Sequence, residues 1–141
     1  SLVLTAAPAD GVSLFVGIGD KAGASVNTGT DLTTLGGTYT TGAITAGLQL
    51  TEVDVSALNG DSDRTHAAVS FAVNENISVS FGMSTIEFED NSKVDQEDSG
   101  FAVSYTMGSM TVAAFANASD NVSGTSGTDD SVKEVSIAFA F

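Results

Sequence analysis

Apolar and polar side chains alternate with a period of two along most of the chain. The final segment shows this most clearly, with large apolar residues at every odd position: Val135, Ile137, Phe139 and Phe141. Successive side chains of a strand point to opposite faces, so this alternation predicts strands and not helices. We predict nine strands, at residues 2–6, 12–19, 32–40, 43–51, 66–73, 77–86, 100–107, 110–117 and 134–141.

The connections between these strands alternate between short and long. The short ones consist of residues favoured in tight hairpin turns and lie at residues 7–11, 41–42, 74–76 and 108–109. The long ones are rich in Gly, Ser, Asn and Asp and lie at residues 20–31, 52–65, 87–99 and 118–133. This alternation is typical of an antiparallel up-and-down transmembrane β-barrel, with tight turns at one rim and long loops at the other.

Charge follows the same division, because nearly all charged residues fall in the connections. The chain carries 18 Asp and Glu against 4 Lys and Arg, a formal charge of −14. A charge facing lipid at mid-bilayer costs about 2–4 kcal/mol, so uncharged strands suit a membrane-spanning wall. The acidic balance favours cations and makes nucleic acid a poor partner.

Composition narrows the class further. With 141 residues the chain is about one domain long, and we treat residues 1–141 as a single all-β domain. No apolar run approaches the roughly 18–20 residues of a membrane helix, whereas a spanning strand needs only about 9–11. The absence of cysteine excludes disulfides and thiolate metal sites.

The alternation also assigns each strand residue to one of two faces. We expect the large apolar residues to face lipid, namely Val12, Leu14, Val16, Ile18, Ile44, Ala46, Leu48, Leu50, Ala67, Val69, Phe71, Val73, Ile77, Val79, Phe81, Met83, Phe101, Val103, Tyr105 and Met107. We expect the small polar residues to line a pore, namely Ser13, Thr34, Thr38, Thr45, Gln49, His66, Ser70, Ser78, Ser80, Ser104, Thr106, Thr111 and Asn117.

Two strands change phase near the long loops. After Leu50 the apolar positions move to Val53 and Val55, and after Met83 they move to Ile86 and Phe88. A β-bulge inserts one residue and produces such a shift. Alternatively, the strand has left the bilayer at this point, and its two faces no longer meet different surroundings.

With this pattern the chain resembles the trimeric general-diffusion porins of alphaproteobacterial outer membranes. Residues 66–141 resemble the last five strands of such a porin, and residues 1–51 resemble the strands that follow its constriction loop. These porins have about 16 strands, so the resemblance implies that the chain is the C-terminal portion of one. Ser1 is then either a processed start or the start of a fragment. The constriction loop has no counterpart here, which leaves pore size and selectivity open.

The resemblance implies a water-filled channel for passive diffusion of small hydrophilic solutes and ions. It also implies a homotrimer in the outer membrane of a Gram-negative bacterium, in contact with membrane lipid and lipopolysaccharide. The barrel-assembly machinery reads the last strand of this family, and the corresponding assembly signal here is Val135, Ile137, Phe139 and Phe141. Acidic long loops would bias the channel mouth toward cations.

Neither an enzyme nor a cofactor is expected. His66 is the only histidine, and no Ser or Cys lies at the spacing of a known catalytic triad. The segment Gly17-Ile18-Gly19 lacks the third glycine and the helix of a dinucleotide-binding loop.

The acidic loop residues are expected to be solvated, with Ca²⁺ bridging to lipopolysaccharide as the alternative. The residues concerned are Asp61, Asp63, Glu87, Glu89, Asp90, Asp95, Glu97 and Asp98, whose spacing does not match an EF-hand. A different class of function also remains open, that of a secreted or surface-layer β-rich structural protein, since such chains are acidic and rich in Gly, Thr and Ala. Partition between detergent and water separates that class from a porin.

Overall fold

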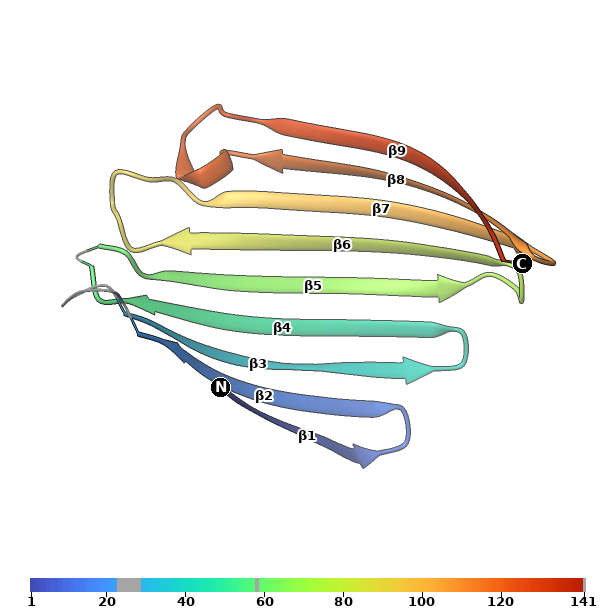
Figure 1. The fold of residues 1–141 in the computed structure, drawn as a ribbon, viewed down its shortest axis with the longest axis horizontal. Coiled ribbons are helices and arrows are strands. Elements are labelled where there is room, and N and C mark those ends of the chain that lie inside the picture. Colours follow the sequence, from blue (N-terminus) through green and yellow to red (C-terminus); the bar gives the residue numbers. More distant parts are fainter. Residues whose placement is uncertain (23–28, 58, 141) are drawn as a thin grey trace.

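The chain folds into one antiparallel sheet (Figure 1). The computed structural model describes residues 1–22, 29–57 and 59–140. Its elements are β1 (Leu2–Ala9), β2 (Val12–Lys21), β3 (Thr30–Thr41), β4 (Ile44–Val55), β5 (Ser62–Ala72), β6 (Ile77–Phe88), β7 (Gln96–Met107), β8 (Met110–Asp120), the 3-10 turn η1 (Val122–Gly124) and β9 (Asp130–Phe139).

Strand order in the sheet follows chain order from β1 to β9. The prediction of an all-β, antiparallel, up-and-down fold is therefore confirmed. Within the described ranges, β1 pairs only with β2 and β9 only with β8, so the sheet is open. Closure into a larger barrel with further strands stays a prediction.

Tight turns lie at one end of the sheet and long loops at the other, as Figure 1 shows on its right and left sides. Gly42 and Ala43 join β3 to β4, and Gly108, with a φ of 61°, begins the turn between β7 and β8. In the turn after β5, the side-chain oxygen of Asn74 accepts hydrogen bonds from the backbone N–H groups of Asn76 and Ile77 (2.8 and 2.9 Å). The short connections thus have the local chemistry that their sequences predict.

β1 extends further than predicted. We expected it to end at residue 6, but it continues to Ala9, and only Asp10 and Gly11 form the turn. Pro8 lies inside this strand although it has no N–H to donate. Because β1 is at the sheet edge and its pairing shifts between Ala6 and Ala9, no ladder hydrogen bond is lost there.

Most other strands also run further, at their long-loop ends. β7 begins at Gln96 instead of residue 100, β5 at Ser62 instead of residue 66, and β4 continues to Val55. The prediction that strands are uncharged along their whole length is therefore wrong at these ends, where Glu97 and Asp98 belong to a strand. The hydrogen bonds between neighbouring strands join backbone groups, so a strand can continue through an acidic residue whose side chain reaches solvent.

The change of phase in β4 and β6 occurs without a bulge. The pairing of β4 with β5 and of β5 with β6 is continuous, with no register shift. Val53 and Phe88 therefore lie on the opposite face from Leu50 and Met83. The bulge interpretation is wrong, and the apolar residues change face near the long loops.

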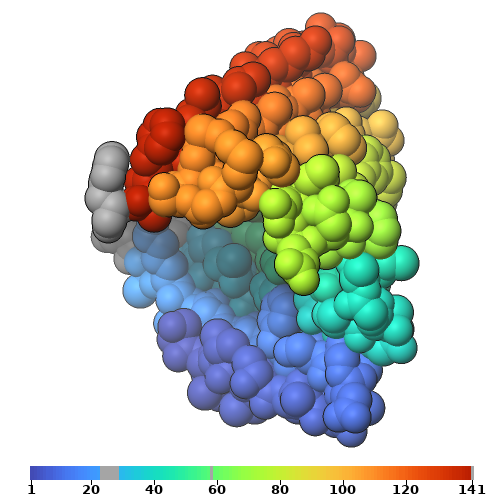
Figure 2. Space-filling model, turned by 90° about the vertical axis from the view of Figure 1, so that its right-hand side faces the viewer, coloured from blue at the N-terminus to red at the C-terminus, as the bar shows by residue number. Residues whose placement is uncertain are grey.

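The sheet is curved into a trough. Figure 2 shows it end-on, with a hollow between the N-terminal strands in blue and the C-terminal strands in orange and red. Along β6 the exposure alternates: Phe81 and Met83 are exposed, whereas Gly82 and Ser84 are half-buried. The more exposed face is convex, and the less exposed face is concave.

Little of the molecule is a conventional core. Among the described residues, Val53 is the one buried hydrophobic residue, at 8% exposure, and no side chain is completely buried. The buried polar residues Thr51 and Ser62 lie on the same concave face near the long loops. The sheet is thus held mainly by pairing between strands, with a small packed region at one end.

Candidate functional site

The convex face carries a belt of exposed apolar side chains. Cross-strand partners lie on the same face, and the continuous register from β2 to β8 places the apolar residues expected to face lipid on the convex side. Val73 is the exception, because it follows the end of β5 and has no register partner among the described residues. Leu48, Phe101 and Ile137 are 52%, 50% and 60% exposed. Such a contiguous apolar surface marks contact with another apolar phase or with a partner.

The height of this belt follows from strand geometry. On β6 it runs from Ile77 to Met83, which at about 3.4 Å per residue is about 20 Å along the strand. Outer-membrane barrels have an apolar band about 25 Å tall, crossed by strands tilted by about 35–45°, so the belt of this sheet is shorter than such a band. Lys133 is a charged exception on the convex face, opposite Ala116 on the edge strand β9.

Beyond the belt, at the long-loop end, the convex face becomes acidic. Asp63 on β5 lies between Glu52 on β4 and Glu87 on β6, each directly opposite it in the register. Like charges in such pairs repel, so these carboxylates favour a solvated surface with bound counterions. The convex face is therefore divided into an apolar belt and an acidic end.

The concave face carries the small polar residues. The register places every residue predicted to line a pore on this face, although their role as a lining remains a prediction. Several hydroxyls pair across strands: Thr34 with Thr51 (3.1 Å), Thr40 with Thr45 (2.9 Å), Ser78 with Ser104 (2.8 Å) and Thr106 with Thr111 (3.1 Å). A polar, hydroxyl-rich surface thus lies directly behind the apolar belt.

A hollow of about 570 Å³ lies on the concave face over β5 to β8. The hollow contains the carboxylate of Asp98, which is oriented by neighbouring side chains. The hydroxyl of Ser84 donates to Asp98 Oδ2 (2.9 Å), and the amide of Gln96 donates to Oδ1 (3.0 Å). The sequence predicts Asp98 in a loop, whereas the structure places it in β7, two residues before Gly100 and on the same concave face. This even spacing from Gly100 is the signal in the sequence that Asp98 faces inward.

His66 also lines this hollow, but not in a catalytic arrangement. In the register Ser84 lies between His66 and Asp98, and its hydroxyl donates to the carboxylate. A Ser-His-Asp triad requires the histidine in the middle, accepting from the serine. The order of these three groups therefore differs from that of a triad.

The β6–β7 and β8–β9 loops are hydrogen-bonded to each other at the long-loop end of the trough, which we call its mouth. The side chain of Asn121 donates to the backbone oxygen of Asp95 (3.1 Å), and the N–H of Ser123 donates to the Gln96 side chain (2.8 Å). The N–H of Val94 donates to the oxygen of Gly124 (3.1 Å). These contacts between distant segments could not be read from the sequence.

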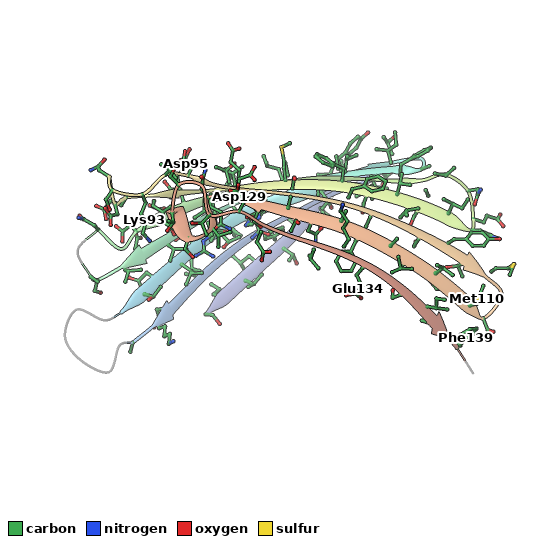
Figure 3. The ribbon with its side chains drawn as sticks, turned by 90° about the horizontal axis from the view of Figure 1, so that it is seen from above. Lys93, Asp95, Met110, Asp129, Glu134 and Phe139 are labelled. Carbon is green, nitrogen blue, oxygen red and sulfur yellow. The ribbon has the colours of Figure 1, made fainter. Side chains whose placement is uncertain are left out.

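Figure 3 shows where these loops lie relative to the strands. Lys93, Asp95 and Asp129 gather near η1 at one end, and Met110 and Phe139 lie at the other. The ammonium of Lys93 is 4.4 Å from the ring centre of Phe88, a cation–π contact. The mouth loops are thus tied to the end of β6.

Asp90 in the β6–β7 loop has a lowered pKa. The Ser92 hydroxyl (2.7 Å) and the Ser92 N–H (2.9 Å) both donate to its Oδ1, and the charge of Lys93 adds to their effect. These groups stabilise the charged form, although desolvation opposes them. Asp90 is accordingly a fixed negative charge of the loop at neutral pH.

In residues 1–22, 29–57 and 59–140, no group of three or more His, Cys, Asp or Glu side chains is arranged to hold a metal ion. The Ca²⁺ alternative remains a prediction. No helix in the same ranges is long and apolar enough to cross a membrane. Of the predicted assembly signal, Val135, Ile137 and Phe139 lie on the convex face, and Phe141 lies outside the described residues.

No protein-family model, curated protein or solved structure matches the chain.

Proposed function

We propose that the chain forms the wall of an outer-membrane β-barrel porin, through which small hydrophilic solutes and ions pass by diffusion. One observation supports this most directly: the convex face is apolar and exposed behind a concave face made largely of small polar residues, as at Phe81 and Ser80. Phe15 and Phe115 are large apolar exceptions on the concave face. Lipid tails remove the cost of exposing the convex face to water, and strand pairing satisfies the backbone within the bilayer.

The proposal requires that both edges of the sheet are paired. An unpaired strand edge is costly in lipid, so β1 and β9 would pair with further strands in a complete barrel. The porin resemblance suggests about 16 strands in total. It also suggests a homotrimer, surrounded by lipid and lipopolysaccharide and assembled through the last strand.

Charge on the concave face supports a preference for cations. This face carries Asp98, Asp130 and Glu134 against Lys21 and Arg64. The whole chain, these residues included, carries a formal charge of −14. A negative wall raises the local concentration of cations and so increases their flux over that of anions.

Reconstitution into planar bilayers tests the proposal. We expect stepwise increases in conductance and, in a KCl gradient, a reversal potential that shows preference for K⁺ over Cl⁻. Protein denatured before addition is the control. Failure to produce steps at any protein concentration would contradict the channel itself, whereas steps with anion preference would contradict only the inference from charge.

A further inference from the structure

The hollow on the concave face has a polar rim and an apolar floor. Its lining includes the polar residues His66, Ser84, Asp98 and Asn117, which we call the rim, and the small residues Gly82 and Ala102, which we call the floor. A Cβ at Gly82 would make only ordinary contact, 3.6 Å from the Cβ of Ala68, so the floor is open above this residue. The hollow of about 570 Å³ is large enough for a small organic molecule.

The carboxylate of Asp98 is oriented before any ligand arrives. Ser84 on β6 donates to one oxygen and Gln96 on β7 to the other. Gln96 is itself held by the N–H of Ser123 in the β8–β9 loop (2.8 Å). The Ser119 side chain on β8 is also within hydrogen-bonding reach of the Asp98 carboxylate. A carboxylate has about four acceptor positions, so one position remains for a further donor. Because these neighbours already hold the Asp98 side chain in place, less side-chain entropy is lost when a ligand binds.

Asn117 provides a neutral acceptor on the same hollow. A Cβ at Gly100 would lie only 2.6 Å from Asn117 Oδ1, which shows that this amide oxygen lies closely over Gly100. The lining thus combines one carboxylate, one amide oxygen, the His66 imidazole and serine hydroxyls with exposed carbon of Gly and Ala. A ligand that matches it has a positive N–H donor group and a short apolar part.

We infer that this hollow binds a small organic ammonium ion, with its N–H groups on Asp98 and its carbon chain on the floor around Gly82 and Ala102. A single carboxylate disfavours divalent metal ions, which take several charged oxygen ligands. Its charge also disfavours anions. A role of this site in transport, in which it retains amines at the wall, rests on the proposed channel. The binding of an ammonium ion does not depend on the channel.

Titration with n-butylammonium chloride, followed by amide NMR of the protein in non-ionic detergent micelles, tests the inference. We expect saturable shifts at the amides of Gly82, Gly100 and Ala102, and none with equal concentrations of NaCl. Asp98→Asn should weaken binding about tenfold or more, because it removes a charge-assisted hydrogen bond. Shifts that do not saturate, or that persist unchanged in Asp98→Asn, would overturn the site.

Asp130→Asn is the matched control. Asp130 is on the same row of the concave face, opposite Ser119, but does not line the hollow, so its neutralisation should leave the affinity unchanged. Equal weakening by both variants would indicate a general charge effect and no specific site. Ala102→Leu keeps the carboxylate and fills the floor, and should also weaken binding.

The readouts separate the two proposals. Binding in micelles requires no conductance, and conductance in KCl requires no amine. Protein that conducts but shows no saturable binding overturns the ammonium site alone. Protein that binds but never conducts overturns the channel and leaves the site as a binding surface.

Discussion

Single residues determine how the loops at the mouth of the trough are fixed. Gly124 has a φ of +77°, and a Cβ there would lie 2.8 Å from the Lys93 Cβ and 2.9 Å from the Phe88 ring. Both the backbone conformation and the space around it exclude a larger side chain. The loop is thus held against β6 at this position.

Gly124→Val should release this loop. A valine held at this positive φ destabilises the folded loop by about 1–3 kcal/mol through backbone strain. Its side chain also collides with Lys93 and Phe88. We expect the N–H of Val94, which donates to Gly124, to exchange with solvent about tenfold faster or more. Gly127→Val is the control, because Gly127 has a φ of +72° but nothing within 4 Å. Equal exchange in the two variants would show that packing contributes nothing.

Ser92→Ala should raise the pKa of Asp90 toward the ordinary aspartate value. The variant removes the hydroxyl bond, which contributes most to the lowered pKa, and keeps the backbone N–H bond. The Ser92 contribution to stability exists above the ordinary pKa and disappears as pH falls through the lowered one. Carboxyl NMR titration measures the change. Asn91→Ala should leave the pKa of Asp90 where it is, and an equal rise in that variant would contradict this account.

At the scale of the element, neighbouring positions of one strand face different surroundings. Val79 and Ser80 are consecutive on β6, with Val79 on the convex belt and Ser80 on the concave face. The two positions share the same backbone pairing and the same strand. They therefore allow a comparison in which only the face differs.

Val79→Lys and Ser80→Lys should differ in stability in a bilayer. Lysine facing lipid costs about 2–4 kcal/mol, whereas lysine facing a water-filled lumen costs little. Denaturant unfolding of protein folded into lipid vesicles measures both. Equal losses in the two variants would contradict the assignment of lipid to the convex face. A change from lipid to non-ionic detergent should reduce the difference but keep its sign.

The alternation of side chains allowed the faces of each element to be predicted, but not its ends. Gln49 and Leu48 were assigned to the correct opposite faces because side-chain direction alternates in any strand. Ends such as Gln96 were missed because backbone hydrogen bonds continue regardless of side-chain polarity. Asp98 was missed with them. The interlocked loops depend on contacts such as Asn121 with Asp95, which no local pattern encodes.

At the scale of the molecule, the apolar convex face decides how the protein behaves in solution. Burial of each large apolar side chain is worth about 1.5–3 kcal/mol, and many of them are exposed together. In cloud-point extraction with Triton X-114, we expect the intact chain to enter the detergent phase. A secreted or surface-layer protein would stay in the aqueous phase, with a hydrophilic protein of similar size as the control. Recovery mainly in water would contradict a lipid-facing surface.

Across the part of the chain that the structure describes, each strand pairs only with its neighbours in sequence. Two strands with their tight turn, such as β5 and β6, therefore start and finish at the long-loop end. Duplication or loss of such a hairpin leaves the direction and the facing of every other strand unchanged. Loss of one strand would instead send the following strand in the wrong direction. The circumference of this wall can therefore evolve in steps of two strands while both of its surfaces are preserved.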